Sequence, residues 1–322
     1  MTKAAEEPSR IRVPTRPLVL GPRQRLLAIG GVTVLSILLA VSGYWSFRDA
    51  ETVPRHEVGF PPPPRLEESI GESLQRLKEN PQDIGALVEL GMLQFQKGKE
   101  FYPDAINALE EARDLGALDS RVFYCLGLMY QEAGLPGFAV EEYRRYLRNH
   151  PDDKEIRMLL AKLLYQQGRY QEAVSEYERL KFHFPKDSLI EENLGLSLWG
   201  AKLTDRALES FVVLRSYGAD PASRAEFYMG QIAFEQMRFN VALEHITRAL
   251  PPEGRELPGL PPERIYSTLA LTHQKLNQPE EARKSWEELL RRVPGDAKAQ
   301  AALKDLNRRF PVKKAKPSAS KR

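Results

Sequence analysis

The sequence predicts an all-α fold, an elongated solenoid of about six helix–turn–helix hairpins preceded by one transmembrane helix. Two observations predict it. Three landmarks recur after 34 residues, namely Gly134, Ala139 and Pro151, then Gly168, Ala173 and Pro185. In addition, residues 26–47 form an apolar segment without a charged side chain, LLAIGGVTVLSILLAVSGYWSF. Together these patterns indicate a membrane-anchored array of repeats.

The repeated landmarks have a physical role in a helical hairpin. A small residue lets the two helices approach closely, and a proline ends the second helix before the next hairpin begins. The small residue of the second helix recurs six times, as Ala105, Ala139, Ala173, Ala207, Ala242 and Ala282. The last interval is 40 residues instead of 34 or 35, because the Pro/Gly-rich segment 251–262 is inserted there.

The second copy of the repeat carries the landmarks most completely. They are Phe123, Leu126, Gly127, Tyr130, Gly134, Ala139, Tyr143 and Pro151. This pattern resembles the tetratricopeptide repeat (TPR), and the resemblance covers residues 84–294. It implies a right-handed solenoid whose inner groove is lined by the first helix of each repeat. Four residues depart from the pattern, namely Ala161 and Lys202 at glycine positions and Glu191 and Glu226 at large apolar positions.

Amphipathic segments flank the repeats on both sides. Before the first repeat, one helical face carries Leu66, Ile70, Leu74 and Leu77. After the sixth repeat, another carries Ala299, Ala302, Leu303 and Leu306. Such helices would cover the apolar ends of a stacked array. We therefore expect an array with capping helices over residues 66–310, followed by a basic disordered tail over residues 311–322.

The apolar segment 26–47 is long enough to cross a membrane. Its 22 residues would span about 33 Å as a helix. Basic residues crowd the preceding tail, residues 1–25, whereas Asp49 and Glu51 follow the segment. The positive-inside rule then predicts a cytoplasmic N-terminus and an array outside the cytoplasm, which is the periplasm if the protein sits in a bacterial inner membrane. A cleaved signal peptide is the alternative, because Ala40, Val41 and Ser42 fit a processing site.

Residues 48–65 are predicted to be a linker. Pro54 and the run Pro61–Pro64 favour an extended polyproline II spacer. The two chain ends carry formal charges of +4 and +5 in a protein of net charge +3, so residues 26–310 are mildly acidic. A nucleic-acid-binding body is usually basic, so no nucleic-acid partner is expected.

Catalytic and metal-binding motifs are missing from the sequence. It contains no phosphate-binding glycine loop, no HExxH motif, no paired-cysteine motif and no serine elbow. The five histidines are scattered, and Cys125, the single cysteine, is expected to be a small buried apolar residue. The sequence therefore predicts a protein that is not an enzyme and holds no cofactor or metal.

Aromatic residues are frequent at the positions that, by the resemblance, face the inner groove. The predicted partner-binding residues are Phe95, Tyr124, Tyr165, Trp199, Phe227 and Phe234. Such rings can anchor a bound helix or extended peptide; alternatively, they pack between neighbouring helices. The basic and asparagine side chains with which some TPR proteins clamp a terminal carboxylate are largely missing, with Lys162 an exception. We therefore expect a hydrophobic or amphipathic partner.

These features predict a non-enzymatic scaffold or assembly factor for protein partners, acting in cell-envelope biogenesis. One alternative is a glycan-handling helper in exopolysaccharide or peptidoglycan export, in which Trp199 and Tyr165 stack on sugar rings. Another is a subunit that activates a separate catalytic chain. The architecture by itself selects none of these pathways.

Overall fold

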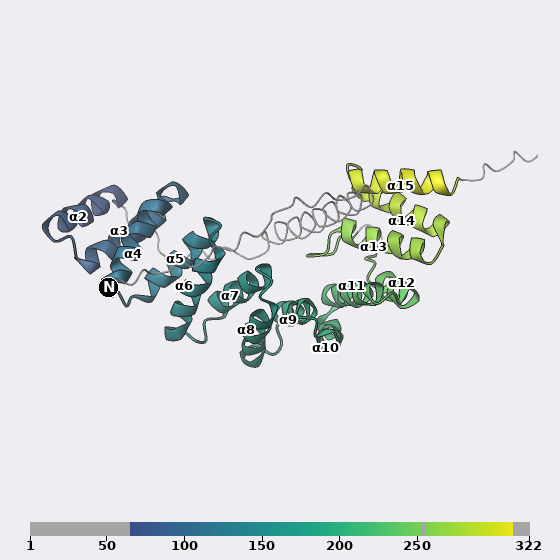
Figure 1. The fold of residues 1–322 in the computed structure, drawn as a ribbon, viewed down its shortest axis with the longest axis horizontal. Helices are drawn as coiled ribbons and strands as arrows, with labels where there is room; N and C mark the ends of the chain where they lie inside the picture. The colour runs from purple at the N-terminus through teal and green to yellow at the C-terminus, as the bar shows by residue number, and fades with distance from the viewer. Residues whose placement is uncertain (1–64, 253–254, 312–322) are drawn as a thin grey trace, which may run out of the picture. The chain divides into compact units, whose positions relative to one another are not determined.

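The computed structural model describes residues 65–252 and 255–311. Within these ranges it contains fourteen α-helices, α2 to α15, two short 3-10 helices and one isolated β-bridge (Figure 1). The predicted segments 1–25 and 26–47, nearly all of the linker 48–65 and the tail after residue 311 lie outside the described ranges. None of the described helices combines the length and apolar character needed to cross a membrane.

Twelve helices form six hairpins, which confirms the predicted repeats. The pairs are α3 (Ile84–Lys97) and α4 (Tyr102–Asp114), α5 (Ser120–Glu132) and α6 (Pro136–Asn149), α7 (Lys154–Gln166) and α8 (Tyr170–His183), α9 (Ser188–Gly200) and α10 (Thr204–Leu214), α11 (Ala219–Glu235) and α12 (Phe239–Arg248), and α13 (Pro262–Lys275) and α14 (Pro279–Arg292). We number these hairpins as repeats one to six. A 3-10 turn, Lys99–Phe101, lies within the first hairpin, and another, Arg215–Tyr217, follows α10.

Both predicted capping helices are present, as α2 (Leu66–Glu79) and α15 (Ala297–Arg309). Helix α2 buries Ile70 in a small cluster with residues of α3 and α4, and its Ser73 is buried as well. The prediction that Leu74 belongs to the buried face is wrong, since its side chain is 45% exposed and Ser73 takes that place. Residues four apart advance by about 40° around a helix beyond a full turn, so Leu74 has drifted from the face that Leu66 begins.

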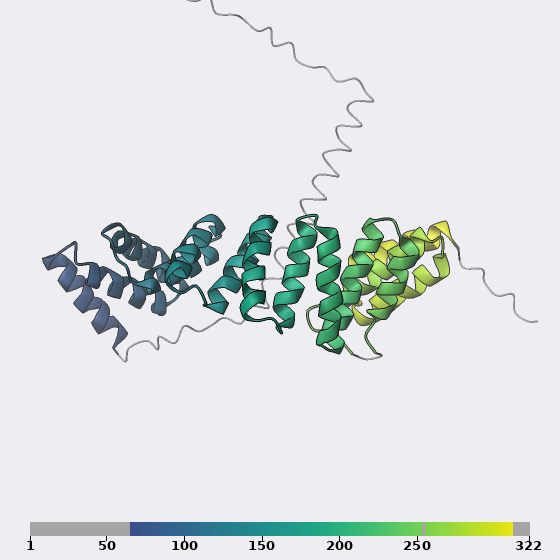
Figure 2. The same ribbon diagram turned by 90° about the horizontal axis from the view of Figure 1, so that it is seen from below.

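The hairpins stack with their first helices together. Each second helix contacts the first helix of its own repeat and that of the next repeat. Successive first helices also contact one another directly, as α3 with α5, α7 with α9, α9 with α11 and α11 with α13. The first helices therefore line one side of the array, called the inner side below, and the second helices form the outer side (Figures 1 and 2).

Local sequence explains where the helices begin and end. In repeats one to four, an aspartate caps the first helix by accepting a hydrogen bond from a backbone amide within its first turn; these caps are Asp83, Asp119, Asp153 and Asp187. The second helices α6 and α8 end at Asn149 and His183, two residues before the landmark prolines Pro151 and Pro185. These boundaries follow the predicted proline stops.

The Leu-Gly landmark marks a close crossing of the two helices in a hairpin. A Cβ atom at Gly127 would lie 2.5 Å from the ring of Tyr143, and one at Gly195 would lie 2.6 Å from the ring of Phe211. Both rings are completely buried. Glycine is therefore required at these positions by the close packing of a large ring against the opposing backbone.

The turn inside each hairpin uses a left-handed residue. Gly134 and Gly168 have φ angles of +71° and +72° in repeats two and three. At the corresponding positions of repeats four, five and six, Lys202, Met237 and Asn277 have φ angles of +64°, +59° and +57°. Lys202, which replaces the usual turn glycine of the repeat, thus adopts the same left-handed backbone conformation, although a side chain disfavours it.

The predicted insertion between repeats five and six folds onto the array. Leu257 and Leu260 form the β-bridge, and both side chains are buried in the main core. Arg224 of α11 donates a hydrogen bond to the carbonyl oxygen of Pro258 (3.2 Å), and Arg255 pairs with Asp220 at 2.5 Å. The described part of the insertion is therefore attached to α11 by both apolar and polar contacts.

Candidate functional site

The aromatic row of the inner side closes the hairpins. Phe95, Tyr165, Trp199 and Phe234 stand at the twelfth position of their repeats and are all half-buried. Three of these rings pack on a ring at the start of the following second helix, at centroid distances of 5.4 Å for Phe95 and Tyr102, 5.3 Å for Tyr165 and Tyr170, and 5.3 Å for Phe234 and Phe239. Part of each of these three rings therefore packs between helices, which is the alternative to partner binding that the sequence left open.

Trp199 and Tyr124 complete the half-buried aromatic set. The indole nitrogen of Trp199 donates a hydrogen bond to Glu235 Oε2 at 3.0 Å, joining repeats four and five. Tyr124 lies 5.9 Å from the ring of Tyr146, and its burial, followed by the charge of nearby groups, raises the pKa of Tyr124. Each ring keeps an exposed part on the inner side, so partner binding by these residues stays a prediction.

Phe227 does not face an open groove. Its ring is 0% exposed, and it packs against the ring of Tyr228. The guanidinium of Arg264, from the next repeat, lies 5.2 Å from the centre of the Phe227 ring. The prediction that Phe227 is available to a partner is therefore wrong, because neighbouring side chains cover it.

Four apolar side chains at positions that face the groove in the TPR pattern, together called the apolar strip below, were not singled out from the sequence. The strip comprises the half-buried side chains of Leu128, Met158 and Leu196 and the exposed side chain of Leu189. Leu128 and Leu196 stand at the ninth position of repeats two and four, and Met158 at the fifth position of repeat three. These positions also face the groove in the TPR pattern, so the sequence carried a signal for them.

A buried polar cluster ends the strip at repeat five. The carboxylate of Glu192 accepts hydrogen bonds from Arg224 Nε (2.8 Å) and from the hydroxyl of Tyr228 (2.8 Å). Burial, and then the charge of Glu192, raise the pKa of Tyr228. Arg224 also holds the insertion through Pro258. The insertion and this cluster together bound the apolar strip on its C-terminal side.

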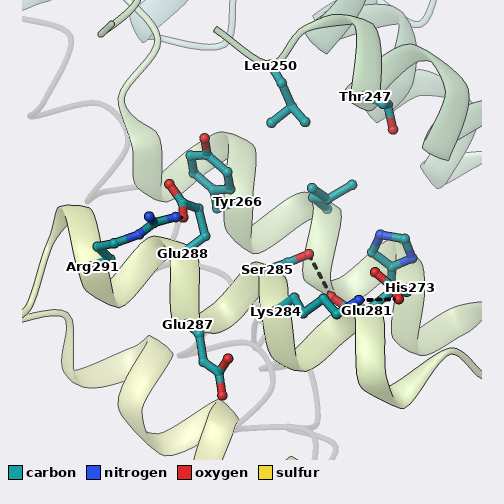
Figure 3. Close-up of a pocket in the computed structure, with 11 residues that line it drawn as sticks. Thr247, Leu250, Tyr266, His273, Glu281, Lys284, Ser285, Glu287, Glu288 and Arg291 are labelled. Carbon is teal, nitrogen blue, oxygen red and sulfur yellow. Dashed lines mark hydrogen bonds and ion pairs between the residues drawn. The ribbon is translucent and has the colours of Figure 1, made fainter. Parts of the chain in front are cut away.

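Two clefts lie on the outer side in the same register. The cleft in repeat four, of about 350 Å³, is lined by Glu178, Lys181, Leu194, Leu198, Arg206, Glu209, Ser210 and Val213. The cleft in repeat six, of about 630 Å³, is lined by Thr247, Leu250, Tyr266, Leu269, His273, Glu281, Lys284, Ser285, Glu287, Glu288 and Arg291 (Figure 3). In both, a first helix forms the floor and two second helices form the walls. No sequence motif had indicated them.

The polar side chains that could support chemistry have structural partners instead. His150 stacks on Tyr146, His183 lies 3.8 Å from Asp152, His245 lies 2.7 Å from Glu226 and His273 lies 2.7 Å from Gln278. Cys125 is buried as predicted, and burial raises the pKa of its thiol to about 12. Across the part of the chain that the structure describes, no three His, Cys, Asp or Glu residues are grouped so that they could hold a metal ion.

The acidic departures from the repeat pattern are likewise paired. Glu191 lies 2.8 Å from Lys181, and Glu226 contacts Arg215 at 3.1 Å as well as His245. Each carboxylate is buried between repeats, where an unpaired charge would be costly. The departures therefore replace apolar packing with ion pairs and leave the fold intact.

Comparisons with known proteins agree with this architecture. The model of the tetratricopeptide repeat matches residues 126–188 and 267–306. The C-terminal part of a TPR repeat-containing protein from Cytophaga hutchinsonii superposes with a TM-score of 0.54 at 14% identity, covering 74% of this chain and 95% of that one. A search of curated proteins finds no match.

Two further structures are similar at lower TM-scores. PilF from Pseudomonas aeruginosa has a TM-score of 0.45 at 18% identity, with 74% of this chain and 97% of that chain covered. The Naa15/Naa10 structure bound to HypK-THB has a TM-score of 0.49 at 18% identity, with 76% of this chain covered; this chain spans only 37% of that one. The family model thus finds tetratricopeptide repeats at residues 126–188 and 267–306, and the Cytophaga structure shares the fold of stacked helical hairpins.

Proposed function

We propose that this protein is a non-catalytic scaffold that binds a protein partner along the inner side of repeats two to four. The apolar strip carries the proposal, because Leu128, Met158 and Leu196 are only half-buried and Leu189 is 48% exposed. Apolar side chains flanked by rings with polar handles suit an amphipathic helix or an extended apolar peptide. The insertion and the Glu192 cluster would stop such a partner at repeat five.

The site of action follows from the sequence alone. Residues 26–47 would anchor the chain in the cytoplasmic membrane, and the basic preceding tail would remain in the cytoplasm. The array would then lie outside the cytoplasm, held off the membrane by the proline-rich linker, where it would assist assembly of the cell envelope. The glycan alternative gains no support, because Tyr165 packs on Tyr170 and the polar atom of Trp199 is bonded to Glu235.

Photo-cross-linking in membranes tests the binding surface. Benzoylphenylalanine would replace Leu189 or Leu196 on the inner side and, as a control of matched exposure, Val212 on the outer side; Leu189 is 48% exposed and Val212 52%. We expect adducts with a protein partner from both inner positions and few from Val212. Equal adduct yields from all three positions, or none from the inner pair, would contradict the proposed surface.

Labelling with a membrane-impermeant maleimide tests the topology separately. Cys125 is buried and unreactive, so a new cysteine can be read against a low background. The variant Leu118→Cys places the thiol in a loop where the side chain is 85% exposed, and Ser9→Cys places it in the predicted cytoplasmic tail. We expect Leu118→Cys to be labelled in intact cells and Ser9→Cys only after lysis; the reverse pattern would overturn the orientation.

A further inference from the structure

Three positions of the repeat meet beneath the outer side of the array. They are positions 4 and 23 of one repeat and position 28 of the preceding repeat. An ion pair joins two of these positions in each of repeats two to five, namely Arg113 with Glu142, Arg157 with Glu176, Lys181 with Glu191, and Arg215 with Glu226. In repeat one, Leu87 and Ala108 stand at positions 4 and 23, and both are buried. Repeats two to five therefore fill this place with charges that neutralise each other.

Repeat six carries no charged side chain at these three positions. Tyr266, Ser285 and Leu250 stand at positions 4, 23 and 28, and all three line the outer cleft of this repeat (Figure 3). In repeat four, where Lys181 pairs with Glu191, the outer cleft has a volume of about 350 Å³, whereas the cleft of repeat six has about 630 Å³. The larger cleft thus occupies the place that an ion pair fills in the preceding repeats.

The hydroxyl of Tyr266 is an unused polar group in this cleft. The residue is only 7% exposed, and its hydroxyl forms no hydrogen bond with another described residue. Arg292 contacts the ring instead, with its guanidinium 5.2 Å from the ring centre. Polar groups buried this deeply in proteins almost always have a hydrogen-bond partner. A ligand that accepts a hydrogen bond from Tyr266 would therefore satisfy a group that the described chain leaves open.

The charged side chains of the cleft favour an uncharged ligand. Those that line it are largely paired with their own helix, as Glu281 with Lys284, and Glu288 with Arg291 and Arg292. Glu287 is exposed at the rim, where water can hydrate it. A charged group that entered the cleft would lose its hydration without gaining an unpaired counter-ion.

The remaining lining suits one residue of a peptide. Leu250 and Leu269 supply apolar surface for an aliphatic or aromatic side chain. The Tyr266 hydroxyl can donate to the carbonyl oxygen beside that side chain, and the exposed hydroxyl of Thr247 on α12 can accept from a backbone amide. Every peptide residue except proline carries these two backbone groups next to its side chain.

We propose that the outer cleft of repeat six binds a peptide segment of a partner protein through one uncharged apolar residue, whose carbonyl oxygen accepts a hydrogen bond from Tyr266. The cleft lies on the outer side and the apolar strip on the inner side, so the array can hold two peptide segments at once. Binding in the cleft does not depend on binding along the strip, and each site is tested separately.

Photo-cross-linking of the full-length chain tests the cleft. The probe is N-acetyl-photoleucine methylamide, which carries an aliphatic diazirine side chain between two peptide groups. Fragmentation of the tryptic peptide 265–275 distinguishes insertion at the cleft residue Leu269 from insertion at Leu271, which stands at the groove-facing ninth position of the same helix. Leu271 is 43% exposed and Leu269 only 7%, so unspecific collisions would favour Leu271. We expect more insertion at Leu269 than at Leu271.

Two variants separate the hydrogen bond from the shape of the cleft. Tyr266→Phe keeps the ring and removes the hydroxyl, so insertion at Leu269 should fall about two- to tenfold, the effect of one hydrogen bond. Leu250→Lys combined with Tyr266→Glu gives repeat six the three residue types of repeat four, which has Lys181, Glu191 and Ser210 there. This double variant should close the cleft and abolish insertion at Leu269. Circular dichroism checks that both variants keep the array folded.

Four outcomes would overturn the proposal. Two are insertion mainly at Leu271 and an unchanged yield at Leu269 in Tyr266→Phe. A third is equal labelling of Leu269 by an alkyl diazirine without peptide groups, which would indicate a site for small apolar molecules. The fourth is stronger labelling by the corresponding photolysine probe, which would indicate a cationic ligand.

Discussion

The left-handed lysine at the turn of repeat four gives a quantitative test of the repeat geometry. Lys202 has a φ angle of +64°, whereas the matching residues of repeats two and three are glycines. A left-handed conformation costs a non-glycine residue about 1–2 kcal/mol, and glycine loses about 0.5–1 kcal/mol more conformational entropy on folding. Lys202→Gly should therefore stabilise this turn by about 0.5–1 kcal/mol.

The backbone bonds around Lys202 remain available to glycine. The amide of Lys202 donates to the carbonyl oxygen of Trp199 at 3.0 Å, and that of Leu203 donates to the carbonyl oxygen of Leu198 at 2.9 Å. The Lys202 side chain is exposed and forms no ion pair with another described residue, so removing it leaves the packing unchanged. The expected gain is thus a backbone effect alone.

Hydrogen exchange measured by mass spectrometry can locate this gain. Stacked repeats open locally, so a single melting temperature would blur the effect. In Lys202→Gly we expect amides of α9 and α10 to be about two- to fivefold better protected, which corresponds to 0.5–1 kcal/mol. The matched control is Gly168→Lys in repeat three, where a new Cβ would meet only Tyr170 at an ordinary 3.9 Å; it should lower protection of α7 and α8. Unchanged or lower protection in Lys202→Gly would refute the strain argument.

Two further predictions concern the polar groups that hold the repeats. The side-chain hydrogen bond from Arg121, reinforced by the Arg121 backbone amide, holds the pKa of Asp119 below its usual value, so the folded chain binds this proton less readily than the unfolded chain. That stabilisation is fully present above the unfolded pKa of about 3.9 and is lost as the pH falls through the lower folded pKa. Urea titrations between pH 5 and pH 2 should therefore show a shallower fall in unfolding free energy for Asp119→Asn than for the parent protein. Parallel curves for the two proteins would contradict this reasoning. Replacement of Glu192 by alanine should destabilise repeats four and five by about 2–4 kcal/mol, because it leaves Arg224 and the buried Tyr228 hydroxyl without their shared acceptor. Urea denaturation followed by circular dichroism measures that loss, with Glu209→Ala on the outer side of α10 as the control; equal effects of the two substitutions would remove the special role of the cluster.

The repeat register could be predicted because its signals are local. The interval between Gly134 and Gly168 reports the length of one hairpin, and Pro151 marks the end of a helix regardless of what packs around it. Capping helices were predictable for the same reason, since their apolar faces lie within one segment. Leu74 lies off the buried face of its capping helix, because a spacing of four residues only approximates the helical period.

The candidate site was predictable only in part. Phe95, Tyr165, Trp199 and Phe234 do stand in one row, as their positions in the repeat indicated. Their partial burial depends on rings that begin the next helix, and a pattern confined to the first helices does not contain that information. Partner binding by these four rings stays a prediction.

The sequence by itself determined the hairpins, their number and the place of the insertion, because each depends on residues close together in the chain. Only the tertiary structure decided which surfaces are open. Phe227 is covered by Arg264 from the next repeat, and an outer cleft lies between helices α12 and α14 in repeat six. Exposure in a solenoid is set by side chains one repeat apart in sequence, and stacking must bring them together before their fit can be judged.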